Sequence, residues 1–218
     1  MNSFTCAWQK IIEVIGGSEV PEDHRHAENT VEWLVRLRPN ANLALLLAAL
    51  GHDIDRATPD RIRRESFDDY DAFKNAHAER SAALLAEIFS ECGVEEAIAS
   101  EACRLVRLHE VGGTPDADLL CDADSLSYFD VILPLYYQRE GYEESLRRCV
   151  WGLRRITPGS QQYLTKMRQS AELQKLVTHA LRIVEQEVEC DTEPASTKTH
   201  ELSDPYSVFR AEKITQGF

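Results

Sequence analysis

Long apolar runs are missing from this sequence. The longest one, around Leu43–Leu50, is far shorter than the roughly 20 residues that a helix needs to span a bilayer. The first residues, MNSFTCAWQK, also lack the basic start and the apolar stretch of a secretory signal. We therefore expect a cytoplasmic protein that does not interact with a membrane.

Paired cysteines of the C-x-x-C type are also absent. A chain of 218 residues can bury a sizeable core and does not need disulfide bonds to fold. We therefore expect reduced, mostly buried thiols and no thiolate metal site. The cysteines are Cys6, Cys92, Cys103, Cys121, Cys149 and Cys190.

Positive charge is scarce, because 24 Lys and Arg residues stand against 37 Asp and Glu residues, for a formal net charge of -13. Nucleic-acid backbones and acidic membrane surfaces repel a chain with this charge. We therefore expect no nucleic-acid partner. A local group of basic side chains can still hold a small anionic substrate.

Alternating patterns typical of β-strands are missing too, and helical periodicity runs through most of the chain. We predict an all-α fold with a single helical domain over residues 1–188, its core at about 20–135, and a linker and tail over 189–218. Pro134 predicts a kink or a break. The predicted helices are Thr5–Val14, Glu22–Arg38, Asn40–Asp53, Ala76–Cys92, Glu95–Glu110, Asp116–Leu133, Glu143–Ile156 and Ser160–Val188.

A set of His and Asp residues falls near the ends of these predicted helices. The most apolar helix, LALLLAAL, leads directly into His52 and Asp53. Each histidine taken alone is more often a hydrogen-bonded helix-end residue than a metal ligand. The ordered set, on apolar helices that can converge, favours a metal site instead. The candidate ligands are His26, His52, Asp53, His77, His109 and Asp124.

Neutral imidazole and carboxylate groups suit one or two divalent transition-metal ions, of Mn, Fe, Zn, Ni or Co. The adjacent His52 and Asp53 can each serve one of two ions, or Asp53 can bridge them. His24 is an alternative to His26, which we prefer for its spacing to His52. Asp122 is an equally good acid beside Asp124.

The order of these residues resembles a known family. His26, then His52 and Asp53 in ALGHD, then Asp124 in DADSL match the H…HD…D pattern of the HD superfamily of metal-dependent phosphohydrolases. His77 in HAERSA and His109 in RLHEVGG resemble the subset that binds two metals, which includes diadenosine tetraphosphatase-like hydrolases and di-iron oxygenases. The resemblance covers roughly residues 20–135.

The resemblance implies a helical HD-domain bundle with helical extensions at both ends. It also implies hydrolysis of a phosphoester or phosphoanhydride in a small molecule, above all a nucleotide, by a metal-activated water. The alternatives are a di-iron oxygenase with the same ligands and a regulatory module without turnover. The sequence departs from many relatives in having HDID for HDIGK, so that Arg56 would stand in for the lysine, and it lacks the GYP motif of cyclic dinucleotide phosphodiesterases.

Further residues near the candidate ligands are expected to act on the substrate. An acid, Asp55 or Glu110, would manage protons. The predicted catalytic residues are Asp53, Asp55, Arg56 and Arg80, and the predicted substrate-binding residues are Arg56, Lys74 and Arg80. A surface salt bridge is the alternative for Arg80.

The stretch RATPDRIRR after the HD motif is locally basic. It predicts an anion-binding loop in which Arg56 is the best placed residue. In the alternative, the pairs Asp60–Arg64 and Arg61–Glu65, at i and i+4, make an ordinary solvated helix face together with Arg63.

Overall fold

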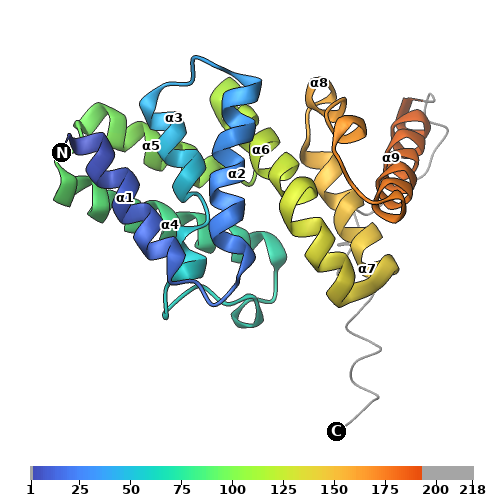
Figure 1. Ribbon diagram of the computed structural model, residues 1–218, viewed down its shortest axis with the longest axis horizontal. Coiled ribbons are helices and arrows are strands. Elements are labelled where there is room, and N and C mark those ends of the chain that lie inside the picture. Colours follow the sequence, from blue (N-terminus) through green and yellow to red (C-terminus); the bar gives the residue numbers. More distant parts are fainter. Residues whose placement is uncertain (1, 193–218) are drawn as a thin grey trace, which may run out of the picture. The chain divides into compact units, whose positions relative to one another are not determined.

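The computed structural model describes residues 2–192, which form helices joined by short loops and contain no β-strand (Figure 1). The prediction of an all-α fold is confirmed. The helices of the first part are α1 (Ser3–Gly16), α2 (Glu22–Leu37), α3 (Leu43–Gly51), α4 (Tyr70–Cys92), α5 (Glu96–Leu108) and α6 (Pro115–Ser127). They are followed by α7 (Leu133–Arg155), α8 (Pro158–Gln161) and α9 (Ala171–Thr192).

Helix α3 lies at the centre of the core and contacts α1, α2, α5 and α6 (Figure 1). It is short and apolar on all sides, as expected of a helix surrounded by others. The Asn42 side chain accepts a hydrogen bond from the backbone N–H of Leu45 and so caps its first turn. At its end, a Cβ on Gly51 would lie 2.6 Å from a methyl carbon of Leu85, so the Leu85 side chain of α4 would have to move to make room for a larger residue.

The segment between α3 and α4 holds two short 3-10 turns, Ile54–Ala57 and Arg64–Ser66. Helix α4 begins at Tyr70 rather than at Ala76, because the Asp69 carboxylate caps the backbone N–H of Ala72. The earlier start places Phe73 and Lys74 on the same helix as His77.

The chain does not leave the helical conformation at Pro134. A single π-helical segment, Tyr128–Ile132, joins α6 to α7, and Pro134 lies in the first turn of α7, where its missing N–H costs little. A second irregularity follows within α7 at Gly141, whose φ of 76° is left-handed.

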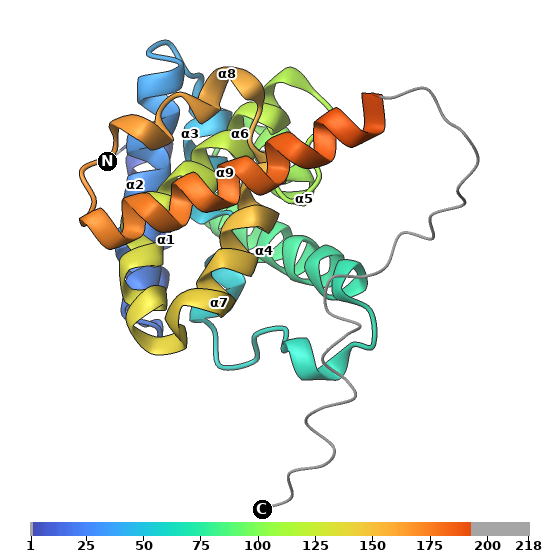
Figure 2. The ribbon, with the colours of Figure 1, turned by 90° about the vertical axis from the view of Figure 1, so that its right-hand side faces the viewer.

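The single helix predicted over Ser160–Val188 is wrong. The structure has α8, a 3-10 turn at Leu164–Lys166, and then α9. Buried Leu164 and Met167 hold the turn against the core, and the Gln169 side chain donates to the Phe129 carbonyl. Figure 2 shows α9 across α7, where the Tyr142 hydroxyl and His179 Nδ1 are 2.8 Å apart.

The prediction of six reduced thiols is wrong for one pair, because Cys6 of α1 and Cys92 of α4 form a disulfide. The three free cysteines, at positions 103, 121 and 149, are buried as expected. Cys190 lies outside the side chains that the structure describes.

Contacts divide the chain into two units, Met1–Val184 and Glu185–Phe218. Of the second unit, the structure describes only the last turns of α9, which reach Thr192. The helix therefore extends into the segment that was predicted to be a linker, 189–218. The rest of the predicted linker and tail lies outside the described residues.

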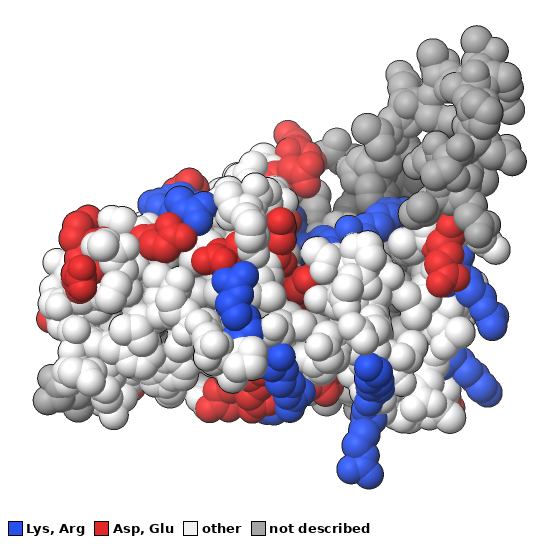
Figure 3. All heavy atoms as spheres, turned by 90° about the horizontal axis from the view of Figure 1, so that it is seen from above, with Lys and Arg blue, Asp and Glu red and all other residues white. Residues whose placement is uncertain are grey.

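None of the helices within residues 2–192 has the length and apolar character required to cross a membrane. On the face of the molecule drawn in Figure 3, acidic and basic side chains are interspersed.

Candidate metal centre

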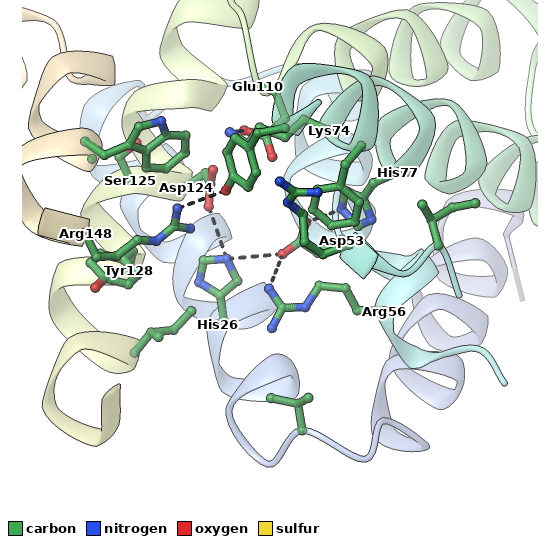
Figure 4. A pocket seen from close by; sticks show the side chains of 18 of the residues that line it. His26, Asp53, Arg56, Lys74, His77, Glu110, Asp124, Ser125, Tyr128 and Arg148 are labelled. Carbon is green, nitrogen blue, oxygen red and sulfur yellow. Dashed lines mark hydrogen bonds and ion pairs between the residues drawn. The ribbon is translucent and has the colours of Figure 1, made fainter. Parts of the chain in front are cut away.

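Four donor groups meet at the inner ends of α2, α3 and α6. His26 Nε2 lies 3.2 Å from Asp124 Oδ1 and 3.3 Å from His52 Nε2, and His52 Nε2 lies 3.5 Å from Asp124 Oδ1. Asp53 Oδ2 completes the group at 3.8 Å from His52 Nε2 and 3.9 Å from His26 Nε2. We call this group site 1, and Figure 4 shows His26, Asp53 and Asp124 pointing toward one another.

A second group uses the other oxygen of the same carboxylate. Asp53 Oδ1 lies 2.8 Å from His77 Nε2 of α4 and 3.8 Å from His109 Nε2 at the end of α5. The three donor atoms all lie within 4.8 Å of one another. We call this group site 2. Asp53 therefore offers one oxygen to each site.

The spacing of the donors fits metal ions. Donor atoms bonded to one ion at about 2.0–2.2 Å lie roughly 3.0–3.5 Å apart in tetrahedral or octahedral coordination. The distances from the two histidine nitrogens of site 1 to each other and to its carboxylates range from 3.2 to 3.9 Å, so small side-chain movements would bring these atoms to a shared ion. The histidines are buried, which keeps competing water from their rings.

Two of the histidines are oriented by the helix that each one ends. His52 caps α3 and His109 caps α5, where the last carbonyls of a helix have no partner within it. His52 Nδ1 donates to the Ala49 carbonyl at 2.9 Å, and His109 Nδ1 donates to the Val106 carbonyl at 2.6 Å. Both rings therefore present the lone pair of Nε2 to the centre.

The other two histidines are oriented by side chains. The Ser127 hydroxyl donates to the His26 carbonyl and accepts from His26 Nδ1 at 2.9 Å. His77 Nδ1 donates to Asp55 Oδ2 at 3.0 Å. All four histidines thus hold their Nδ1 proton on a protein acceptor, as metal-ligating histidines do.

The electrostatics of the two sites attract cations. Burial lowers the pKa of His52 and His77, but carboxylates outweigh it, and the pKa rises to about 9 for His52 beside Asp53 and Asp124. Asp53 and Asp55 raise the pKa of His77 to about 10. Burial dominates at His109 and lowers its pKa to about 4. Because protons and metal ions compete for the same nitrogens, metal affinity is expected to rise with pH.

Sites 1 and 2 lie at the floor of a cavity of about 340 Å³. Lys74 Nζ lies in this cavity, paired with Glu110 and 3.8 Å from the centre of the Trp151 ring. Burial lowers the pKa of Lys74 to about 8, although Glu110 acts in the opposite direction. Arg56 also lines the cavity, and its guanidinium contacts Asp53 Oδ2 at 3.3 Å.

Two residues predicted to be catalytic do not reach the cavity. Asp55 is fully buried behind His77 and accepts from His77 Nδ1 and from the Ile62 backbone N–H, so it contacts a candidate ligand and not the cavity. Arg80 pairs with Asp60 at 2.6 Å and is not among the residues that line the cavity. This contact is the salt bridge that was the alternative to a catalytic role for Arg80.

The structure also decides between the alternative ligands. His24 is half-buried and lies 3.8 Å from Glu28, whereas His26 belongs to site 1. Asp122 accepts hydrogen bonds from the backbone N–H and the hydroxyl of Thr157, at the start of α8, and belongs to neither donor group.

The basic stretch after the HD motif is not a solvated helix face with i, i+4 pairs. Arg61 pairs with Glu19, and Arg64 donates to the Phe67 carbonyl. Arg61, Arg63 and Arg64 all line the cavity.

Arg155, which contacts the candidate site directly, was not predicted from the sequence. Its guanidinium lies 3.0 Å from Asp124 Oδ2 and 3.0 Å from Glu110 Oε2, and it donates to the His109 carbonyl. The spacing of Arg148, Trp151 and Arg155 places them on one face of α7. This spacing is the feature of the sequence from which a shared location of the three residues could have been predicted.

The comparisons with known proteins give one family. Residues 10–177 match the model of a domain of unknown function, DUF4202, and the chain belongs to this family. All candidate ligands, together with Arg148 and Arg155, fall inside the matched range. Neither the curated proteins nor the solved structures contain a match.

Proposed function

We propose that this protein is a metal-dependent phosphohydrolase that acts on a small phosphorylated molecule, a nucleotide above all. The observation that carries the proposal is the carboxylate of Asp53, which faces two His-containing donor groups at the floor of a cavity lined by Lys and Arg side chains. The ordered H…HD…H…H…D set, which resembles the HD superfamily, supports the same reaction.

The donor set fits two divalent transition-metal ions, of Mn, Fe, Zn, Ni or Co. Imidazole nitrogens and carboxylate oxygens without thiolates are typical ligands for these ions. His26, His52, Asp124 and Asp53 would hold one ion, and His77, His109 and Asp53 the other. When bound, such ions supply positive charge to phosphate oxygens and lower the pKa of water.

The chain itself contributes positive charge and a proton donor. Arg56 lies against Asp53 and is held from the other side by Asp23, with Arg56 Nη2 at 2.8 Å from Asp23 Oδ1. These two ion pairs hold the guanidinium at the edge of site 1, where a phosphate oxygen can reach its remaining N–H groups.

Lys74 is the best placed group to protonate a leaving oxygen. Its ammonium lies inside the cavity, and a pKa of about 8 leaves it protonated at neutral pH but able to release the proton. Glu110 cannot serve as this acid: burial raises its pKa, but Arg155, His109 and Lys74 outweigh that and hold it below its ordinary value.

Two rivals use the same ligands. A di-iron oxygenase needs the same His and Asp set, but the cationic lining of the cavity favours an anionic substrate. A regulatory module without turnover would be expected to have lost a ligand, whereas all six positions are present and converge.

Metal analysis of protein purified without chelators, followed by a phosphatase screen with Mn and Fe, tests the proposal. We expect about one to two first-row metal ions per chain and metal-dependent release of phosphate. Protein that binds no metal on titration would exclude the centre. Oxygen consumption without phosphate release would favour the oxygenase.

The two histidines of α2 provide a matched control. His26→Ala should lower metal content, because it removes a donor from site 1. His24→Ala, at a half-buried position two residues away on the same helix and outside site 1, should leave the metal content unchanged.

A further inference from the structure

The cavity above the metal centre carries more positive charge than one phosphate group requires. Seven basic side chains and four carboxylates line it, in a protein with a net charge of -13. The basic residues are Arg56, Arg61, Arg63, Arg64, Lys74, Arg148 and Arg155, and the acidic ones are Asp53, Glu65, Glu110 and Asp124. Metal ions at the floor would increase this excess further.

Three of the basic side chains form ion pairs with carboxylates at or beside the candidate metal centre. Arg155 lies between Asp124 and Glu110, Lys74 pairs with Glu110, and Arg56 pairs with Asp53. Their charge is largely offset by the carboxylates beside them. The other four basic residues line the rest of the same cavity.

One wall of the cavity, formed by α6, the π-helical segment and α7, holds Arg148. Its guanidinium carbon lies 4.2 Å from the centre of the Trp151 ring and 5.4 Å from that of the Tyr128 ring. Arg148 also donates to the Tyr70 hydroxyl at 3.3 Å. Aromatic rings on both sides hold the guanidinium in place, and Figure 4 shows it beside Tyr128.

Two buried hydroxyls on the same wall have no hydrogen-bond partner among the described residues. They are Ser125 Oγ and Tyr128 Oη, and both residues line the cavity. Ser125 is 2% exposed and Tyr128 is 8% exposed, so bulk water does not satisfy them. A buried hydroxyl without a partner is costly, so each would gain stability from an anion that a small side-chain movement brings within its reach.

Arg63 adds a basic group at the rim of the cavity. It is exposed, and its side chain makes no hydrogen bond or ion pair with any residue in the range that the structure describes. A long flexible cation of this kind can close over an anion once it has entered.

We propose that the substrate carries two anionic groups: a phosphate at the metal centre and a second phosphate or carboxylate held by Arg148, Ser125, Tyr128 and Arg63. The inference rests on the proposed function for its first anionic group only. The second subsite stands on residues that are not metal ligands. Guanidinium and hydroxyl donors together are typical of phosphate recognition.

Binding of phosphonates to the metal-loaded protein tests the second subsite. Methylphosphonate offers one anionic group, and a series of alkane bisphosphonates of increasing chain length offers two. We expect one chain length to bind at least about tenfold more tightly than methylphosphonate, because only a matched length reaches both groups. Metal content is measured after each titration, so that chelation is not mistaken for binding.

Three variants and a control identify the residues. Arg63→Gln, Arg148→Gln and Tyr128→Phe should each reduce the bisphosphonate advantage over methylphosphonate by roughly three- to tenfold. Tyr128→Phe removes one hydroxyl and keeps the ring, and Arg63 is exposed, so neither change should unfold the protein. Arg147→Gln is the control, because Arg147 precedes Arg148, pairs with Glu144 and does not line the cavity.

The outcomes separate this inference from the proposed function. If a simple monoester such as p-nitrophenyl phosphate is hydrolysed but bisphosphonates have no advantage, the second subsite is rejected. The same holds if the variants weaken both phosphonates equally. If no phosphate ester is hydrolysed but the advantage exists and depends on Arg63 and Tyr128, the second subsite is supported and the proposed hydrolysis is rejected.

Discussion

Site 1 and site 2 share Asp53 but differ in how completely the protein surrounds them. Site 1 has four donors from α2, α3 and α6, with neighbouring atoms 3.2–3.9 Å apart. Site 2 has three, and His109 Nε2 remains 3.8 Å from the shared carboxylate. A metal with fewer protein ligands keeps open positions for water or substrate. In the proposed centre, an ion in site 1 would therefore be held more tightly, and an ion in site 2 would leave positions open for the substrate.

The largest effect is expected from removing what the two sites share. Asp53→Ala takes one oxygen from each site, so both ions should be lost and turnover should fall by roughly three orders of magnitude or more. The helical content should survive, because Asp53 follows the end of α3 and is not part of the core. Metal analysis, kinetics and circular dichroism measure these effects. Near-normal activity of the variant would show that the assigned centre is wrong.

Substitution of single ligands should distinguish the metal content of the two sites. His77→Ala and His109→Ala remove donors of site 2 only, so each variant should retain about one ion per chain. His52→Ala removes a donor of site 1, so this variant should lose the more tightly bound ion. Metal content after dialysis checks the difference. Full metal content in both site 2 variants would indicate a centre with a single ion.

Smaller effects are expected from the groups that orient the ligands. Asp55→Asn weakens the acceptor of His77 Nδ1, and Ser127→Ala removes that of His26 Nδ1. Each change should lower the metal affinity of its own site by about 10- to 100-fold and leave the other site unaltered. Competition with a metal-sensitive dye measures both affinities. Equal losses at both sites in either variant would contradict their independence.

An effect on turnover alone is expected from the charge at the edge of site 1. Arg56→Gln should cost roughly 1–3 kcal/mol of transition-state stabilisation, seen as a lower kcat/KM, with metal content unchanged. Arg80→Gln is the matched control, because Arg80 pairs with Asp60 away from the cavity. Steady-state kinetics on the best substrate from the screen compare the two. Identical kinetics would remove Arg56 from the substrate site.

Some of the ligand geometry is local and could be predicted. His52 and His109 each follow an apolar helix, and the Nδ1 atom of each bonds the carbonyl three residues earlier. This interaction needs only the end of a helix, since its last carbonyls lack partners. The sequence pattern therefore identified both residues, together with their neighbours Asp53 and Glu110.

The surroundings of Asp55 and Arg80 could not be predicted, because they depend on distant partners. Asp55 and Arg80 lie near ligands in the sequence, but Asp55 packs behind His77 and Arg80 turns toward Asp60. The break after α8 has the same origin, since Gln169 is held by the Phe129 carbonyl 40 residues away. Proximity along the chain predicts neither the direction of a side chain nor its partner.

The sequence by itself determined the helical class, the main helices and the six candidate ligands, because apolar periodicity and helix-end signals act over a few residues. Only the tertiary structure decided that Asp53 faces both sites, that Arg155 of α7 bonds Asp124 and Glu110, and that a disulfide joins α1 to α4. These contacts join residues far apart in the chain. Their formation depends on how whole helices pack, which short-range patterns do not specify.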